Sequence, residues 1–292
     1  MPTVDVNNIR IAYETFGDPE NPPLVLIMGL VTQMIGWPDR FCRMLAGAGH
    51  YVVRFDNRDT GLSTKMEALG MPDLMRLATD LRGGKQVSVP YRLEDMAADT
   101  WGLMAALGIS KASVCGISMG GMIAQVMALE KPERLGSLIC LQTTSGESDL
   151  PHSTQEAREA MMSAPPTERE AYLDYIVEVN SVFCGHSEYM DRELQRGISA
   201  AAFDRMWYPA GFGRQMAAIM AAPGRRGPLG TLKVPTLVIH GDRDTLIPLE
   251  HGKDLATAIP GAKLLVVKGL GHGMAYPTLW EQMVQAMTEI TH

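Results

Sequence analysis

The chain has 292 residues, of which 46% are hydrophobic and 20% are charged, a balance typical of a globular protein with a large buried core. Its formal net charge of −7 argues against nucleic acid as a partner, because phosphate binding requires clustered Lys and Arg. The adjacent Arg225 and Arg226 lie among Gly and Pro residues and are expected to form a solvated turn.

The chain begins without the basic start and apolar run of a signal peptide, and its longest apolar stretch, residues 24–31, is too short to span a bilayer. We therefore expect a cytoplasmic protein that has no membrane partner. The four cysteines are widely spaced and lack paired histidines, which argues against disulfides and a zinc site. Neither a metal ion nor a cofactor is predicted.

The first half of the chain alternates short β-rich runs with helical patterns, which is typical of a mostly parallel sheet. It opens with a predicted antiparallel hairpin over residues 4–16, turning at Asn7-Asn8. Strands are predicted at 24–28, 51–55, 112–117 and 135–141, with helices at 38–48, 93–107 and 119–130.

Between about residues 146 and 229 the pattern becomes helical, as at 155–162 and 167–179, before strands and helices alternate again. The last predicted elements are strands at 235–240 and 263–267 and helices at 250–258 and 279–290. The sequence therefore predicts an α/β core, residues 1–146 and 230–292, with a helical cap insertion at 147–229. Such a cap would lie over the carboxyl edge of the sheet, where open α/β sheets bind their ligands.

Residues 116–120 read Gly-Ile-Ser-Met-Gly, a G-x-S-x-G motif centred on Ser118. The motif follows a predicted strand and opens a predicted helix, which is the setting of a nucleophile elbow. In so sharp a turn the positions two residues away on either side must lack a Cβ, and the helix N-terminus favours a developing negative charge. We predict that Ser118 is a nucleophile; the alternative is a glycine-rich loop that happens to contain a serine.

A serine hydroxyl needs a base to accept its proton. His272 lies in a glycine-flanked loop between the last predicted strand and helix and is the predicted base, whereas His240 ends a strand and is expected to be structural. A carboxylate should orient the base, and both Asp242 and Asp244 lie in a suitable loop. We prefer Asp244, which lies deeper in the loop, and expect Asp242 to cap the turn.

Acyl transfer also needs N–H donors for the oxyanion. One predicted donor is the backbone N–H of Met119, which follows the nucleophile. The second is the N–H of Leu30, where the neighbouring glycine keeps the backbone approachable. Four residues are predicted to contact the substrate: Gly29, Trp37, Met206 and Trp207.

Four motifs in chain order make the sequence similar to the α/β-hydrolase superfamily over essentially its full length: Met28-Gly29, residues 56–63, the elbow, and residues 240–244 with Gly271-His272. Within it, the chain most resembles the aclacinomycin methylesterase-like branch of bacterial carboxylesterases, through residues 36–39, 58–64, 251–253 and 259–260.

The resemblance implies a mostly parallel eight-stranded sheet with helices on both faces and a helical cap. It also implies a triad of Ser118, Asp244 and His272, with oxyanion donors at Leu30 and Met119. Many members have His-Gly where this chain has Met-Gly at 28–29; because the donor is a backbone N–H, this changes the pocket wall more than the mechanism.

Aromatic residues are enriched in the predicted cap, which holds eight of the eighteen in the chain. Apolar walls over a polar triad suit a hydrophobic ester better than a sugar or a peptide. The sequence thus predicts a serine carboxylesterase for small to medium apolar esters, with methyl esters among the candidates.

Two alternatives stay open. The same triad can serve perhydrolase or haloperoxidase-like chemistry, lactone or thioester hydrolysis, or carbon–carbon bond hydrolysis. A hydrolase-fold receptor would instead keep the pocket for recognition alone. The sequence also leaves open whether the chain is a monomer or a homodimer.

Overall fold

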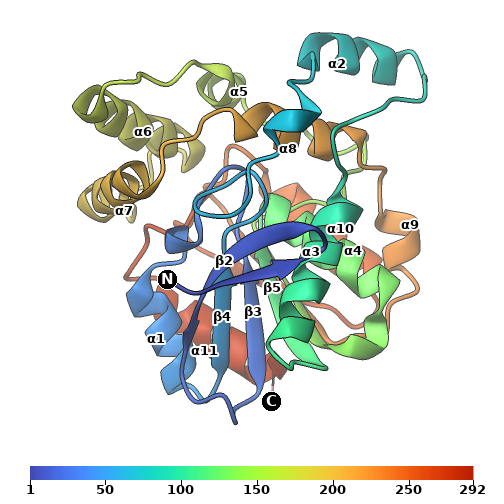
Figure 1. Cartoon of the computed structure of the whole chain (residues 1–292). Helices are drawn as coiled ribbons and strands as arrows, with labels where there is room; N and C mark the ends of the chain where they lie inside the picture. The colour runs from blue at the N-terminus through green and yellow to red at the C-terminus, as the bar shows by residue number, and fades with distance from the viewer. Residues whose placement is uncertain (292) are drawn as a thin grey trace.

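A computed structural model describes residues 1–291, and its centre is a single eight-stranded sheet (Figure 1). The strands are β1 (Thr3–Val6), β2 (Ile9–Phe16), β3 (Pro23–Ile27), β4 (Tyr51–Phe55), β5 (Ala112–Ile117), β6 (Leu135–Leu141), β7 (Thr236–Gly241) and β8 (Lys263–Val267). Their order in the sheet is β1-β2-β4-β3-β5-β6-β7-β8. The β1–β2 and β2–β4 pairs are antiparallel, and the remaining pairs are parallel.

The opening hairpin turns where the sequence predicts it. Asn7 and Asn8 have φ values of +48° and +60°, a conformation that asparagine tolerates better than most residues. The hairpin gives the sheet its antiparallel edge, and the parallel strands that follow place their carboxyl ends together.

Helices cover both faces of this sheet. The α-helices of the described residues are α1 (Asp39–Gly47), α2 (Leu74–Arg82), α3 (Leu93–Ala106), α4 (Met119–Glu130), α5 (Gln155–Met162), α6 (Arg169–Phe183), α7 (Arg192–Arg205), α8 (Gly211–Ala221), α9 (Arg226–Leu229), α10 (Leu249–Ala258) and α11 (Trp280–Thr291). α1 and α11 pack on one face, and α3, α4 and α10 on the other. This confirms the predicted fold class.

Alternation along the strands divides the core into two layers. In β3, Leu24 and Leu26 face α1 and α11, whereas Val25 and Ile27 face α3 and α4, and all four are fully buried. A strand buried on both faces has a continuous apolar run, which is why these strands are readable in the sequence.

The segment between β6 and β7 contains α5 to α9. Figure 1 shows α5 to α8 and α2 at the same end of the sheet, with α8 next to α2. The sequence predicted α5 and α6 but not α2, α7 or α8. In α2, Leu74, Leu77 and Leu81 recur at helical spacing, and in α7 Leu194, Ile198 and Ala201 do so, although only Leu77 and Ser199 are buried. Both helices therefore have a periodic signal that the prediction missed. The cap boundaries at 147 and 229 stay a prediction.

Two arginines, one of them fully buried, join this segment to the loop after β4. An Nη atom of Arg205, at the end of α7, lies 2.7 Å from Asp56 Oδ2. Arg214 in α8 donates to both carboxylate oxygens of Asp59 at 2.8 Å, and their side chains are 2% and 0% exposed.

The prediction of a solvated turn at Arg225 and Arg226 is wrong. Arg225 is 4% exposed, donates to Gln125 Oε1 at 2.9 Å and to Thr144 O at 3.1 Å, and burial lowers its pKa to about 10. Arg226 pairs with Asp254 at 2.6 Å. These partners come from distant elements, which the local Gly and Pro composition does not reveal.

Candidate active site

Ser118 lies on a strained turn between β5 and α4. Its φ of 56° and ψ of −123° are a conformation that residues with a side chain rarely adopt. A Cβ on Gly116 would lie 2.0 Å from Gly120 O, and one on Gly120 would lie 2.1 Å from Ile27 O. Both positions therefore require glycine, as the elbow motif predicts, and the turn leaves the Ser118 side chain partly exposed.

His272 and Asp244 lie together at the carboxyl edge of the same sheet. His272 Nδ1 is 2.8 Å from Asp244 Oδ2, and the two side chains are 11% and 0% exposed. The other oxygen of Asp244 accepts the N–H groups of Leu246 and Ile247 at 3.0 and 2.7 Å. Two backbone hydrogen bonds thus orient the carboxylate toward the imidazole.

Asp242 has a different partner. Its Oδ1 accepts the N–H of Gly269 at 2.7 Å and so ties the loop after β7 to the turn after β8. The sequence left open which of the two aspartates is the partner of His272, and the geometry favours Asp244. Asp242 instead stabilises the turn after β8.

His240 lies behind the acid. Its Nε2 donates to Ile247 O at 2.8 Å and lies 3.7 Å from Asp244 Oδ2. The side chain is fully buried, and burial lowers its pKa, which favours the neutral imidazole. This is the structural strand-end position predicted for it.

The loop after β3 brings backbone close to the nucleophile. A Cβ on Gly29 would lie 3.2 Å from Ser118 Cβ, so a side chain there would crowd the serine. Within residues 1–291 the N–H of Leu30 has no protein acceptor, and Met119 is the first residue of α4, whose N–H has no partner inside the helix. Whether these two N–H groups bind an oxyanion therefore stays a prediction.

The next residue in this loop, Val31, has a φ of 45°, an outlier for a β-branched side chain. Its N–H donates to Oε1 of the buried Gln215 in α8 at 2.6 Å. Gln215 also donates to Arg58 O and Thr60 Oγ1, both at 2.8 Å. A residue of the helical segment therefore contacts the loop of the expected oxyanion donor, which no local sequence signal indicated.

The predicted substrate contacts fall in different places. Trp37 is fully buried and stacks on Phe41 with ring centroids 5.9 Å apart, so its side chain belongs to the core, in contrast to the predicted substrate contact. Trp207 packs against Tyr172 and Phe203 with centroids 4.6 and 4.8 Å away. Met206 is 37% exposed.

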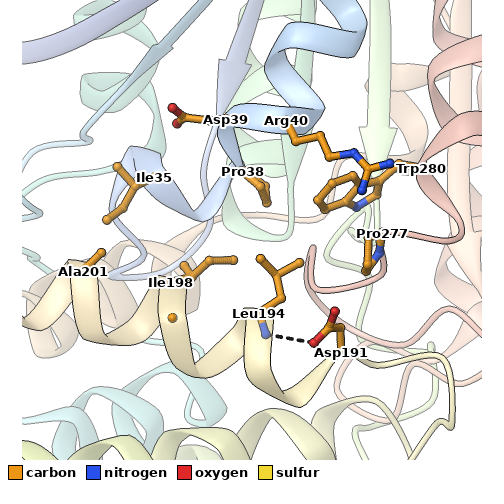
Figure 2. A pocket seen from close by; sticks show the side chains of 11 residues that line it. Ile35, Pro38, Asp39, Arg40, Asp191, Leu194, Ile198, Ala201, Pro277 and Trp280 are labelled. Atoms are coloured by element: carbon orange, nitrogen blue, oxygen red, sulfur yellow. Dashed lines mark hydrogen bonds between the residues drawn. The ribbon is translucent and has the colours of Figure 1, made fainter.

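A groove of about 530 Å³ lies between α7 and the start of α1 (Figure 2). Its walls are mainly apolar, and Arg40 lies beside Trp280 with the guanidinium carbon 6.0 Å from the ring centroid. None of Ser118, Asp244 and His272 lines this groove, so it is not part of the candidate triad.

Over 1–291 no group of three or more His, Cys, Asp and Glu side chains is arranged to hold a metal ion. Over the same range no helix is both long and apolar enough to cross a bilayer.

Comparisons with known proteins agree with this architecture. The sequence model of a family described as alpha/beta hydrolase fold matches residues 22–182, which is more than half of the chain. The chain belongs to the α/β-hydrolase family. A second family, described as TAP-like protein, matches residues 214–286 of this α/β-hydrolase. The superfamily resemblance carried by the four motifs is thereby confirmed.

Relatives place the α/β-hydrolase near the methylesterase branch that the sequence resembles. A rhodomycin D methylesterase of Streptomyces peucetius is 30% identical, and one of Streptomyces sp. (strain C5) is 28% identical; each match covers 94% of this chain and 93% of the relative. A solved meta-cleavage product hydrolase from Pseudomonas fluorescens IP01 has a TM-score of 0.74 at 20% identity, covering 99% of this chain and 97% of that one. The structural likeness shows the shared fold alone.

Proposed function

We propose that this α/β-hydrolase is a serine carboxylesterase that cleaves small to medium apolar esters, methyl esters among them, through an acyl-enzyme. The observation that carries the proposal is the 2.8 Å contact of His272 Nδ1 with Asp244 Oδ2, at the sheet edge that also presents the strained Ser118. This contact holds a proton on Nδ1 and leaves Nε2 to accept the proton of Ser118.

The reaction follows from these positions. Ser118 Oγ attacks the ester carbonyl carbon while His272 Nε2 takes its proton, and the N–H groups of Leu30 and Met119 stabilise the oxyanion. His272 then protonates the alkoxide oxygen as the C–O bond breaks and the alcohol leaves. Water, deprotonated by the same imidazole, attacks the acyl-enzyme and releases the acid.

Two observations support the substrate class. The aromatic cluster of Tyr172, Phe203 and Trp207 lies in the helical segment between β6 and β7, where apolar walls favour apolar ligands. Two relatives are named as methylesterases, which brings methyl esters into the proposal.

We place the enzyme in the cytoplasm. Its four cysteines, Cys42, Cys115, Cys140 and Cys184, are free and buried, and free thiols are typical of a reducing compartment. We also keep the division into a core and a cap at 147–229 as a proposal.

The test is hydrolysis of p-nitrophenyl butyrate and of a methyl ester, with labelling by a fluorophosphonate. Ser118→Ala should lower turnover by about 10⁴-fold or more and abolish labelling, because triad members act as a unit. Ser137→Ala removes another buried hydroxyl, bonded to Ser113 Oγ at 3.0 Å, and should retain both. Hydrolysis that survives in Ser118→Ala, or a label on another serine, would overturn the proposed function.

A further inference from the structure

The turn that follows β6 contacts the proposed nucleophile. This β6 turn, defined as residues 141–143, bonds both sides of the Ser118 peptide backbone. Leu141 O accepts the N–H of Ser118 at 3.0 Å, and Thr143 Oγ1 donates to Ser118 O at 2.6 Å. The strained conformation of Ser118 is therefore held from the neighbouring strand.

The middle residue of the β6 turn, Gln142, reaches in another direction, to the loop of the proposed base. It is fully buried and has a φ of +47°. Its Nε2 donates to Gly271 O at 2.7 Å and to Gly273 O at 3.3 Å, and its Oε1 accepts the N–H of Gly273 at 2.7 Å. Both ends of the amide are thus bonded to the two residues that flank His272.

Other bonds hold the start of the loop around His272: Asp242 Oδ1 accepts the N–H of Gly269 at 2.7 Å, and Leu270 O accepts the N–H of Arg243 at 3.0 Å. Gly273 has a φ of +120°, which glycine alone adopts readily, and a loop flanked by glycines has many conformations open to it. Besides its contact with Asp244, His272 donates its own N–H to Phe183 O at 3.3 Å. The three bonds of Gln142 therefore hold the two residues next to His272, whereas the other bonds hold the loop before Gly271 and His272 itself.

We propose that Gln142 is a positioning residue, which holds the imidazole of His272 at a fixed place relative to Ser118. The inference rests on the proposed function, since it assigns Gln142 a role through its base. The β6 turn then fixes the position of the nucleophile relative to the base. Leu141 and Thr143 hold the backbone of Ser118, and Gln142 holds the loop of His272. Displacements of about 1 Å between reacting groups cost roughly 10²-fold in rate.

The role predicts an effect on one half of the reaction in particular. His272 must protonate an alkoxide leaving group, whereas p-nitrophenolate departs without protonation. A displaced imidazole therefore harms the cleavage of an alkyl ester more than that of a nitrophenyl ester with the same acyl group. General loss of folded enzyme lowers both rates equally.

The experiment compares kcat/KM for ethyl butyrate and p-nitrophenyl butyrate in the wild type and in Gln142→Met. We expect a loss of about 100-fold on ethyl butyrate and about tenfold or less on the nitrophenyl ester, within the range of acid–base contributions. The ratio of the two values does not depend on the concentration of active enzyme, so partial unfolding leaves it unchanged.

Gln125→Met is the matched control. Gln125 is also a fully buried glutamine, and it donates to Thr144 O at 3.1 Å and accepts from Arg225 at 2.9 Å without touching the His272 loop. It should lose stability and keep the wild-type ratio. If Gln142→Met does not fold, Gln142→Asn is used, because asparagine tolerates a positive φ but is one methylene too short to keep the contacts.

An equal loss on both esters, or the same change of ratio in Gln125→Met, would overturn the role of Gln142. Either result leaves the proposed function standing as long as hydrolysis depends on Ser118. Loss of that dependence is the separate outcome that removes the proposed function itself.

Discussion

The turns at the sheet edge and the helices between β6 and β7 are held by different forces. At the edge, neutral hydrogen bonds to the backbone fix the site, as where Leu141 bonds Ser118. The helices are joined to the core by neutral bonds such as those of Gln215 and, in addition, by buried charges, above all Arg214 on Asp59. The chemistry thus depends on backbone geometry, whereas the attachment of the helical segment also depends on a few ion pairs.

The largest expected effect is on the sheet-edge side of this comparison. Asp244→Asn should lower kcat for p-nitrophenyl butyrate by about 10⁴-fold, because the amide no longer stabilises the imidazolium of His272 or fixes its tautomer. Asp242→Asn should stay within about tenfold of the wild type, since Asp242 bonds Gly269 and not the base. Steady-state kinetics on both variants give the measurement, and equal losses would leave the acid unassigned.

The next effect is on the side of the buried charges. Arg214→Met should lower the free energy of unfolding by about 3–5 kcal/mol, because it leaves the buried carboxylate of Asp59 without its cation. Urea unfolding followed by circular dichroism measures the loss. The double variant Arg214→Met/Asp59→Asn should recover part of it; no recovery would show that charge is not what holds α8.

A smaller effect is expected on the pH dependence of stability, through the buried His240 at the sheet edge. Burial lowers the pKa of His240 below its usual 6.5, so the unfolded chain binds this proton more readily than the folded one. The free energy of unfolding should therefore fall as the pH drops below about 6.5. His240→Asn should show a shallower fall between about pH 7.5 and pH 5 in denaturant titrations. An unchanged slope would contradict a neutral, buried His240.

The smallest effect is expected at the outer face of the helical segment. Arg196 pairs with Asp174 and Glu170, whose side chains are 76% and 61% exposed. Exposed pairs are screened by water and salt, so Arg196→Ala should leave the midpoint of thermal unfolding unchanged at moderate ionic strength. A drop as large as that of Arg214→Met would mean that exposed and buried pairs contribute alike.

Sequence patterns were sufficient where local chemistry determines structure. The strands β4, β5, β6 and β8 and the helix α4 have the predicted bounds, because apolar runs and the elbow glycines are local signals. The patterns were insufficient where partners are distant in the chain. Gln142 meets Gly271 across 129 positions, and Gln215 meets Val31 across 184. Neither contact leaves a trace near either residue.

The same limit explains Trp37. A tryptophan beside a predicted ligand loop is equally compatible with a pocket wall and with core packing, and only its stacking on Phe41 decides between them. The helix α2 is a different case, because Leu74, Leu77 and Leu81 recur at helical spacing and the prediction overlooked this local pattern. The structure adds that α2 rests against α8.

The attachment of α7 and α8 has a consequence for protein engineering. Arg205, Arg214 and Gln215 all contact the 56–60 loop or its neighbours, and their partners lie outside the segment between β6 and β7. A chimera that receives this segment from a relative must therefore also keep side chains that can bond the 56–60 loop. The other side chains of the segment can then differ. Exchanging the other side chains of the segment while retaining Arg205, Arg214 and Gln215 offers a route to enzymes that prefer different esters. The residues proposed to react would stay unchanged.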